Sequence, residues 1–318
     1  MKVSAVIVNY NGALFLEKCI NAVLEQSLRP AEVLLIDSCS TDTSLETAAK
    51  YPQCKLINMK TNIGFAAAAN KGIKETSGDY VLLLNSDTCL KTDFLEKIGR
   101  TAEKLGAEYG LYSGKLLRMQ DESTVDSAGQ FIRSSLRPLE RNYGKADKNY
   151  LSGDCFSVCG AVMFLKRELL ESIKFKEEYF DEDFFMYFED FDLGLRANAL
   201  GWKCYYESTA VAFHFRGGSD WKKGNKFFLF RKKNLELKRH ILANRYLVLT
   251  KNIPLPIILK NLPHIIVYEV FFWLYLLVFD IRVIPGMKKY FRLRALLKEK
   301  GKTTRTKIRK AEISKWII

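Results

Sequence analysis

The sequence predicts an α/β fold in which helices cover both faces of a mostly parallel β-sheet. Between residues 3 and 105, apolar runs of four to six residues alternate with longer segments in which apolar residues recur every three to four positions. The short runs have the length of buried strands, and the longer segments have the period of helices. Strands that alternate with helices in this way are typical of a three-layer sandwich with parallel strands.

The elements of this first half follow one another regularly. The expected strands are Val3–Val8, Val33–Ile36, Lys55–Asn58 and Tyr80–Leu84. The expected helices begin after Asn11-Gly12, at Asp42 or Thr43, at Phe65 and at about Thr92, and the last two end near Glu75 and Leu105. Apolar residues make up 48% of the chain, which is enough for a sizeable core and argues against extensive disorder.

The second half is less regular from about residue 110 to 165, where it contains Asp126-Ser127-Ala128-Gly129. An aromatic and acidic stretch over residues 179–192 then leads into a helix. The expected later elements are a strand at Val162–Leu165, a helix that ends at Leu200 before Gly201, and strands at Trp202–Tyr206 and Val211–Phe213.

The positive charge is concentrated in the last third of the chain. Residues 1–221 hold 26 Lys and Arg against 31 Asp and Glu, whereas residues 222–318 hold 24 against 5. A nucleic-acid binder could show this pattern, but so could a protein that docks on anionic lipid. The same region is strongly apolar over Ile253–Pro285, most densely over Ile265–Phe279, which favours lipid. Because a spanning helix needs roughly 20 apolar residues, an in-plane or re-entrant helix fits better.

The cysteines and the N-terminus favour the cytoplasm. The seven cysteines are odd in number and scattered, and no CxxC pair occurs, so neither a disulfide framework nor a zinc site is indicated. The apolar run Val3–Val8 is too short for a signal peptide and has no cleavage site after it. We therefore expect no export.

Polar residues follow three of the predicted strands. They are Asn9-Tyr10-Asn11, Asp37-Ser38 and Asn85-Ser86-Asp87. Ligands of parallel α/β sheets bind beyond the carboxyl ends of the strands. We therefore expect these three groups to converge on one crevice.

Two of these acidic residues have a functional and a structural interpretation. Asp87 is well placed to hold a hard divalent cation, which prefers carboxylate and phosphate oxygens, but it could also be a helix N-cap. Asp37 could accept the imide N–H of a uracil or thymine base, or it could form an Asx-turn with the residues that follow it. The residues alone leave both alternatives open.

The segment from Asn62 to Asn70 joins a glycine to a run of small residues at the start of a helix. Small side chains let the backbone approach a diphosphate or a ribose closely. The segment is not the GxGxxG dinucleotide fingerprint. Tight packing of the helix on the sheet would also favour alanines, so this alternative stays open.

The acids Glu189 and Asp190 lie among aromatic residues, which would raise a carboxyl pKa toward a value useful for a general base. The alternative is a solvated helix start, where acids are common. Asp192 and Arg196 are four residues apart and could form an ion pair. His214 follows a predicted strand and precedes Gly217-Gly218, which suggests a loop that closes on a ligand; a metal-ligand role is as well supported as a structural one.

Together, these motifs resemble the inverting family 2 glycosyltransferases of GT-A fold, within them the rhamnosyltransferase-like branch. The resemblance covers roughly residues 3–250. It rests on the order and spacing of Val6–Gly12, Ile36–Ser38, Asn62–Ala66, Asn85-Ser86-Asp87 at the place of the family's DxD motif, Glu189–Leu193 with Arg196, His214 with Gly217-Gly218-Ser219, and Asn244-Arg245-Tyr246 with Lys251-Asn252. The first acid of DxD is replaced by Asn85, so metal coordination depends on Asp87 and on His214.

The resemblance implies a role for each motif. The implied nucleotide-sugar contacts are Asn9, Tyr10, Asn11, Asp37, Asn62, Gly64, Phe65, Asn70, Asn85, Ser86 and Asp87, with Tyr10 and Asp37 at the base. Asp87 and His214 would hold Mg²⁺ or Mn²⁺ against the diphosphate. Asp190 would deprotonate the acceptor hydroxyl, with Glu189 as the second candidate. The expected acceptor or sugar pocket comprises Gly160, Ala161, Asp192 and Arg196.

The implied organisation is a catalytic domain over residues 1–221 and a helical C-terminal region over residues 222–318. The catalytic domain would divide into a nucleotide-binding half, about 1–110, and an acceptor-binding half, about 111–221. The implied activity is inverting transfer of a sugar, with rhamnose from dTDP-rhamnose favoured, to a saccharide or lipid-linked acceptor in cell-surface polysaccharide synthesis.

The C-terminal region would bind the inner face of the cell membrane. The alternative is a helical hairpin that packs on the catalytic domain or on a second subunit. We expect no nucleic-acid partner. The alternatives are a nucleotide-sugar-binding scaffold without turnover and a nucleic-acid-binding protein that uses the basic tail.

Overall fold

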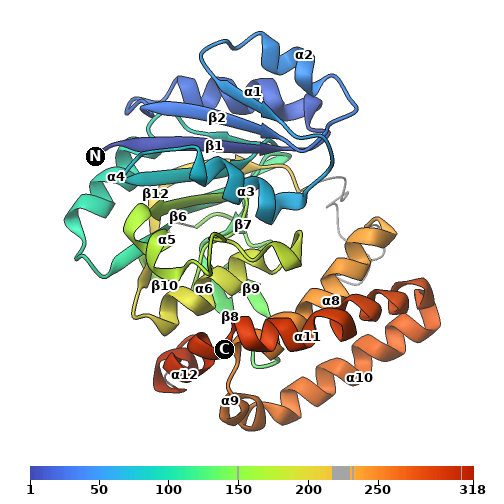
Figure 1. Ribbon diagram of the computed structural model, residues 1–318. Coiled ribbons are helices and arrows are strands. Elements are labelled where there is room, and N and C mark those ends of the chain that lie inside the picture. Colours follow the sequence, from blue (N-terminus) through green and yellow to red (C-terminus); the bar gives the residue numbers. More distant parts are fainter. Residues whose placement is uncertain (149, 217–229, 231–232, 309) are drawn as a thin grey trace.

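The computed structural model describes residues 1–148, 150–216, 230, 233–308 and 310–318 (Figure 1). The Gly217-Gly218-Ser219 part of the histidine motif and the expected boundary at residue 221 lie outside the described residues.

In the described part of the chain, ten strands form one mixed sheet. Eight of them follow the order β10-β12-β6-β11-β4-β1-β2-β3, while β5 pairs with β12 and β7 pairs with β6. The strands are β1 (Val3–Asn9), β2 (Glu32–Asp37), β3 (Lys55–Asn58), β4 (Tyr80–Asn85), β5 (Thr88–Leu90), β6 (Tyr109–Arg118), β7 (Asp121–Ser127), β10 (Gly153–Cys155), β11 (Val162–Lys166) and β12 (Lys203–His214). The four strands predicted first are parallel neighbours. A separate hairpin pairs β8 (Gln130–Ile132) with β9 (Pro138–Glu140).

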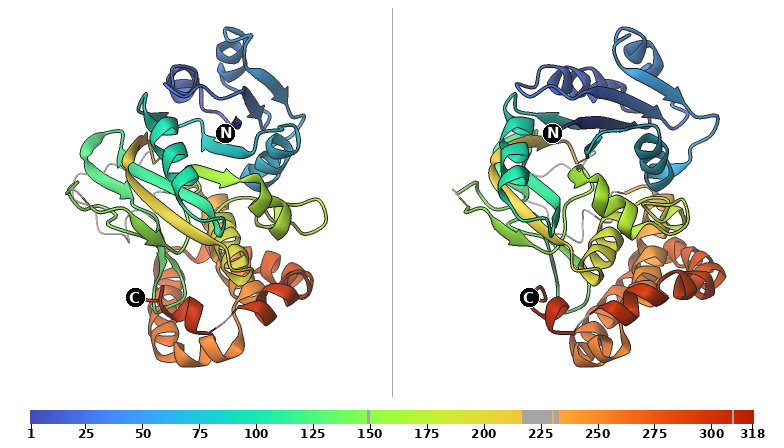
Figure 2. Two further views of the ribbon diagram at one scale, coloured as in Figure 1. Left: turned by 90° about the vertical axis from the view of Figure 1, so that its left-hand side faces the viewer. Right: turned by 60° about the vertical axis from the view of Figure 1, so that its left-hand side comes forward.

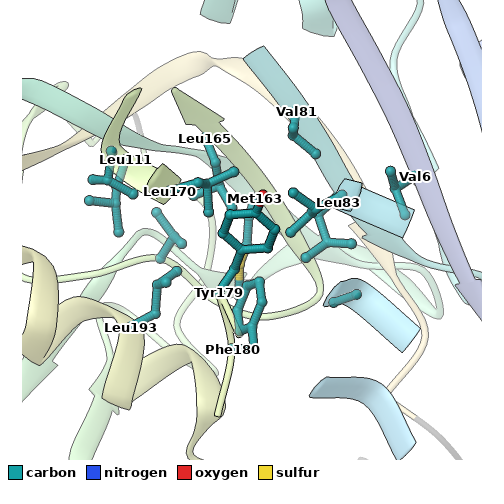
Figure 3. Close-up of a cluster of buried hydrophobic side chains, with 14 of the residues drawn as sticks. Val6, Val81, Leu83, Leu111, Met163, Leu165, Leu170, Tyr179, Phe180 and Leu193 are labelled. Carbon is teal, nitrogen blue, oxygen red and sulfur yellow. The ribbon is translucent and has the colours of Figure 1, made fainter. Parts of the chain in front are cut away.

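Helices cover both faces of this sheet, as predicted. They are α1 (Ala13–Leu24), α2 (Ser44–Ala49), α3 (Gly64–Lys74), α4 (Phe94–Lys104), α5 (Arg167–Ile173) and α6 (Glu189–Ala199). Alternate residues of β1 point to opposite faces, so Val6 packs in the cluster with α3, α5 and α6, and Ile7 packs in the cluster with α1 and α4. Figure 3 shows the first cluster, in which Met163 lies beside Leu170 and Tyr179 in the middle, with Val6 and Leu193 on opposite sides.

The region after residue 105 differs most from the sequence prediction. Residues 109–118 form β6, a long and almost wholly buried strand. The two strands predicted at 202–206 and 211–213 are wrong as separate elements, because β12 runs unbroken from Lys203 to His214 beside β6. The polar residues between them only shift the register between Glu207 and Val211. A bulge of this kind bends a strand without ending it.

The C-terminal helices form a separate layer. They are α8 (Leu235–Asn252), α9 (Leu255–Lys260), α10 (Leu262–Phe279), the 3₁₀ turn η2 (Ile281–Gly286), α11 (Met287–Lys300), α12 (Lys302–Lys307) and α13 (Lys310–Ser314). Figure 2 shows them in orange and red at the end of the molecule opposite β1 and β2. They share a hydrophobic cluster with the rest of the fold, in which Leu247, Val248 and Leu297 meet Phe184 and Phe191.

Helix α10 exposes apolar side chains to solvent. Of its 18 residues only Tyr275 and Leu276 are buried. The exposed large apolar residues of α10 are Leu262, Ile266, Val267, Val270, Phe271, Leu274, Leu277, Val278 and Phe279. By length and composition alone, α10 could cross a membrane. A surface this apolar marks a site of interaction with a membrane or another protein.

Candidate active site

The carboxyl ends of β1, β2 and β4 lie side by side, as the sequence predicted. Asn9 is level with Asp37 on β2, and Val8 is level with Asn85 on β4. Gly12 lies between these ends: a Cβ atom there would be 2.3 Å from Asn9 Oδ1 and 2.4 Å from Ser86 Oγ. The glycine therefore lets the start of α1 close onto the crevice.

Asp37 anchors the first two loops of the crevice. Its carboxylate accepts hydrogen bonds from Asn9 Nδ2 (2.7 Å), from the backbone N–H of Ser40 (2.8 Å) and from Ser40 Oγ (2.7 Å). Asn11 holds the same loop, because its Oδ1 accepts from the N–H of Thr41 at 2.7 Å. These contacts are those of the Asx-turn alternative. Tyr10, between the two asparagines, stays 50% exposed and is free to stack on a base.

Asp87 lies in the short connection between β4 and β5. Helix α4 begins at Phe94, with Asp93 at its N-cap position, so the N-cap interpretation of Asp87 is wrong. Strand β5 pairs with the end of β12 and brings Thr88 level with His214. As a result, His214 Nε2 lies 3.6 Å from Asp87 Oδ1.

A second carboxylate, Asp126, orients the histidine from behind. His214 Nδ1 lies 2.8 Å from Asp126 Oδ2, and Arg216 Nε lies 2.7 Å from Asp126 Oδ1. Burial raises the pKa of Asp126, but Arg216 and His214 more than reverse this, so the carboxyl stays ionised. Burial likewise opposes the charged form of His214, yet its hydrogen bonds to Asp126 and Asp87 raise its pKa to about 9.

The donor set at Asp87 and His214 fits a divalent cation, which would take the place of the proton that His214 Nε2 directs at Asp87. A carboxylate oxygen and an imidazole nitrogen face each other, and a buried carboxylate on the other ring nitrogen is the usual support of a metal-bound histidine. Within the described ranges, no group of three or more His, Cys, Asp or Glu side chains is arranged around one point. The remaining ligands would therefore have to come from a substrate, as is common for Mg²⁺ sites.

The paired acids begin α6. Asp190 Oδ2 accepts hydrogen bonds from the backbone N–H of Gly160 (3.0 Å) and from Gln130 Nε2 (2.8 Å). Burial raises the pKa of Asp190 in spite of these bonds. Burial and the nearby charge of Asp190 raise the pKa of Glu189 to about 8. Asp190 is thus held firmly by two hydrogen bonds, and burial favours the protonated form of Glu189.

A chain of contacts joins Asp190 to the pair formed by Asp87 and His214. Gln130 Nε2 also donates to Glu140 Oε1 at 3.0 Å, and Glu140 Oε1 lies 3.9 Å from Arg216 Nη2. Arg216 in turn binds Asp126, which holds His214. The two acidic motifs, about a hundred residues apart, are therefore joined through one continuous network of polar contacts with a guanidinium at its middle.

The loop before α6 is strained and closely packed. Phe185, Tyr187 and Phe188 have φ angles of 66°, 66° and 73°, which cost an aromatic residue about 1–3 kcal/mol each. The side-chain amide of Asn244 on α8 offsets this cost, because its Nδ2 donates to the carbonyl oxygens of Phe184, Met186 and Tyr187 at 2.8–2.9 Å. The loop that carries Glu189 and Asp190 is thus held in place from the C-terminal layer.

The segment 62–70 packs against the same loop. Gly64 has a φ of +77°, and a Cβ atom there would lie 2.5 Å from the Phe185 ring, so only glycine fits. Asn70 is buried, and its amide binds the backbone of Tyr179 and Phe180. These contacts favour the packing interpretation for Gly64 and Asn70, and Asn62 at the exposed start of the turn is the residue open to a ligand.

Asp192 and Arg196 form a buried ion pair of 2.8 Å, the alternative given by their spacing. Asp192 also binds Lys251 Nζ at 2.8 Å, and Lys251 reaches Asp181 at 2.7 Å. Lys300 Nζ completes this buried ionic network at 2.8 Å from Asp181. The network joins α6 to α8 and α11, and these contacts favour a structural role over a place in the acceptor pocket.

Sequence reasoning missed Gln130, Glu140, Arg216 and Asn244, and it gave Asp126 no role. Asn244 had a signal, since it belongs to a motif of the resemblance. Gln130 and Glu140 had none, because they sit on short strands in a segment without clear periodicity. Ala161 is buried beside Gly160, at the start of β11.

Comparison with known proteins identifies the family. Residues 4–174, more than half of the chain, match the model of Glycosyl transferase family 2. The chain belongs to this glycosyltransferase family.

Two curated relatives represent the similarity in sequence. The chain is 30% identical over 160 residues to the putative teichuronic acid biosynthesis glycosyltransferase TuaG of Bacillus subtilis, covering 49% of this chain and 60% of that protein. It is 27% identical over 251 residues to the N-acetylglucosaminyl-diphospho-decaprenol L-rhamnosyltransferase of Mycobacterium tuberculosis, covering 67% of this chain and 76% of that protein.

Solved structures establish the GT-A type of fold. The S. aureus TarS 1-349 structure in complex with UDP has a TM-score of 0.51 at 18% identity, covering 79% of this chain and 70% of that one. The Pyrobaculum calidifontis mannosyltransferase PcManGT in complex with GDP-Man and Mn²⁺ has a TM-score of 0.53 at 17% identity, covering 93% and 75%. The predicted fold class is confirmed.

Proposed function

We propose that this glycosyltransferase moves a sugar from a nucleoside-diphosphate sugar to a saccharide acceptor and inverts the anomeric configuration. The observation that carries the proposal is the run of contacts from Asp87 through His214, Asp126, Arg216, Glu140 and Gln130 to Asp190. It connects cationic groups that suit a diphosphate with a carboxylate that suits deprotonation of a hydroxyl.

On the donor side, Tyr10 stacks on the nucleobase of the donor, and Asp37 fixes the loop that surrounds this nucleobase. Asn62 and the turn that follows face the ribose. Asp87 and His214 would hold Mn²⁺ or Mg²⁺, and such a metal would supply positive charge for the departing diphosphate. Arg216 adds a fixed positive charge next to them.

On the acceptor side, Asp190 is the general base. It takes the proton of the acceptor hydroxyl while that oxygen attacks the anomeric carbon from the face opposite the nucleoside diphosphate. The new C–O bond forms as the bond to the diphosphate breaks, so configuration inverts without a covalent enzyme intermediate. Gly160 and Gln130 each occupy one direction at Oδ2, which fixes the direction of the carboxylate.

We propose rhamnose from dTDP-rhamnose as the transferred sugar and a lipid-linked saccharide as the acceptor. The rhamnosyltransferase of Mycobacterium tuberculosis supports this, because its name describes a sugar on a diphospho-decaprenol lipid. The names of TuaG and of the Rhizobium meliloti succinoglycan biosynthesis protein ExoO, 29% identical over 233 residues, support a place in cell-surface polysaccharide synthesis.

We further propose that α10 docks the protein on the inner face of the cell membrane. Its outward face is apolar, and the C-terminal region that surrounds it has 24 Lys and Arg against 5 Asp and Glu. A basic segment gains about 1 kcal/mol per Lys or Arg near an anionic surface. The acceptor lipid would be met at the same surface.

The test is a turnover screen of the purified full-length protein with dTDP-rhamnose and other nucleotide sugars, with Mn²⁺ or with EDTA. Release of nucleoside diphosphate that needs both the metal and Asp87 is the expected result. Donor binding without turnover for every nucleotide sugar and acceptor would instead support the non-catalytic scaffold. Sugar transfer that persists in EDTA would contradict the metal role.

A further inference from the structure

A cavity of about 600 Å³ opens where the turn of the β8–β9 hairpin meets α10. It lies at the far end of the hairpin from the active site. Its walls are Arg133, Ser134, Ser135 and Arg137 of the turn, Pro263, His264, Val267, Tyr268 and Phe271 of α10, and Ile318. None of these residues has a part in the chemistry proposed above.

One wall of the cavity carries the two guanidinium groups of Arg133 and Arg137, beside the carboxyl group of Ile318, which accepts a hydrogen bond from Ser134. The Arg137 guanidinium stacks 3.6 Å over the ring of Tyr268, and its Nε donates to Ser135 Oγ. Neighbouring Arg245 has its own partner, Glu269. Among the described residues, no carboxylate lies within ion-pairing distance of Arg133 or Arg137. Burial, together with the positive charges of Arg245 and Arg133, lowers the pKa of Arg137, although Tyr268 opposes this change.

The opposite wall is apolar and leads outward. Val267 and Phe271 are 57% and 65% exposed, and they continue into the exposed apolar face of α10. A ligand that fills both walls therefore needs an anionic group and a hydrocarbon chain. A phosphorylated lipid has both, and guanidinium groups bind phosphate oxygens in a matching fork geometry.

The hairpin connects this cavity to the base. Gln130 and Glu140 pair at one end of β8–β9 and contact Asp190 and Arg216, whereas Arg133 and Arg137 flank its turn. A strand rises about 3.3 Å per residue, so Arg133 lies about 10 Å along the hairpin from Gln130. That separation suits a sugar joined to a diphosphate.

We propose that Arg133 and Arg137 bind the diphosphate of a lipid-linked saccharide acceptor, with its lipid along α10 and its sugar directed toward Asp190. This inference rests on the proposed function, since it requires a lipid-linked acceptor. The anionic headgroup of a bilayer phospholipid offers related chemistry, and the experiment separates the two sources.

The probe is farnesyl diphosphate, a short prenyl diphosphate, titrated into the full-length protein by calorimetry in EDTA so that no metal bridges it to the nucleotide site. We expect binding, with farnesol and inorganic diphosphate each at least about tenfold weaker. Arg133→Gln and Arg137→Gln should each weaken the binding of farnesyl diphosphate by about tenfold or more. Arg137→Lys, which keeps the charge and much of the stacking, should weaken it less.

Arg294→Gln is the matched control, because it removes an exposed arginine of α11 that does not line the cavity. It should leave the affinity for farnesyl diphosphate unchanged, and thermal melting checks that every variant folds. Flotation with phosphatidylcholine vesicles containing phosphatidylglycerol is the second arm. Arg133→Gln and Arg294→Gln should weaken flotation equally.

Three results would overturn the inference. They are no binding of farnesyl diphosphate, an equal loss of that binding in Arg294→Gln, and a loss confined to vesicle flotation in Arg133→Gln, which would assign the arginines to bilayer lipid. Turnover of a nucleotide sugar in the same preparation shows which proposal has failed: turnover without prenyl diphosphate binding refutes only the cavity, and prenyl diphosphate binding without turnover refutes only the transferase mechanism.

Discussion

The backbone N–H of Gly160 donates a 3.0 Å hydrogen bond to Oδ2 of Asp190, from an element 30 residues earlier in the chain. The start of β11 and the start of α6 are thereby fixed to each other. Because Gly160 donates from the main chain, the bond does not depend on a side-chain rotamer. Together with Gln130, it gives the proposed base one defined orientation.

Replacing the base should stop turnover and spare donor binding. In Asp190→Asn the amide still accepts from Gly160 but cannot take a proton, so we expect kcat to fall about 10²–10⁴-fold. Steady-state rates and calorimetric titration with the nucleoside diphosphate check both halves of this prediction. Unchanged turnover would assign the base elsewhere.

The buried acid Glu189 should make stability depend on pH. Its pKa is raised to about 8 from 4.5, so the folded state binds more protons than the unfolded state between these values. The contribution of this group to stability is therefore full below about pH 4.5 and is lost as the pH rises toward 8. Glutamine does not ionise, so Glu189→Gln does not lose this stability as the pH rises. Between pH 5 and pH 8 its free energy of unfolding should therefore rise relative to that of the parent protein, by an amount on the order of a few kcal/mol.

Guanidinium denaturation of both proteins at pH 5 and pH 8 measures this difference. Asp183→Asn, at another acid of the same segment that is partly exposed and paired with Lys300, serves as the comparison. A stability difference between Glu189→Gln and the parent that is the same at both pH values would show that Glu189 titrates normally.

Removing the proposed metal ligand should abolish metal-dependent transfer. Asp87 is partly exposed and its side chain packs little, so Asp87→Ala should keep the fold. We expect a loss of about 10²–10³-fold in kcat, the size seen when one electrostatic contact to a developing charge is removed. Initial rates across a Mn²⁺ titration test this, and full activity in the variant would refute the role.

Asn244 should position the base without touching substrate. Asn244→Ala removes the side-chain donor of the Met186 and Tyr187 carbonyls, at about 1–3 kcal/mol for a buried unsatisfied group, whereas the Phe184 carbonyl keeps Lys289 Nζ as a donor. Asn198→Ala is the matched control, because Asn198 Nδ2 donates to two backbone carbonyls outside the strained loop, those of Phe156 and Gly194. Both should lower the melting temperature, but only Asn244→Ala should lower kcat, with little change in the donor KM. A parallel loss of kcat in both variants would indicate a purely structural role.

The exposed face of α10 should bind membranes. Leu274 and Val278 are 52% and 70% exposed, so changing both to Asp should cost little stability while it weakens liposome binding severalfold or more. Leu14→Asp, on α1 at the opposite end of the molecule and 82% exposed, is the control (Figure 1). Equal liposome binding by all three proteins would point to a protein partner for α10.

The sequence predicted the nucleotide end of the site because parallel strands place their ends together. Asn9, Asp37 and Asn85 each follow an apolar run, and the pairing of β1, β2 and β4 made them neighbours. The other end depends on contacts that no local pattern encodes. Asp126 reaches His214 across 88 residues, and Asp190 meets Gln130 across 60.

The buried ionic network has a practical meaning for shortened versions of the protein. Asp181 and Asp192 both depend on the ammonium group of Lys251, and Asp181 also on that of Lys300. Cutting the gene before α8 would strip these aspartates of their lysine counter-ions, and breaking a buried pair costs about 3–5 kcal/mol. A whole domain is stable by only about 5–15 kcal/mol. Removing the apolar C-terminal region to improve solubility would therefore yield a misfolded fragment.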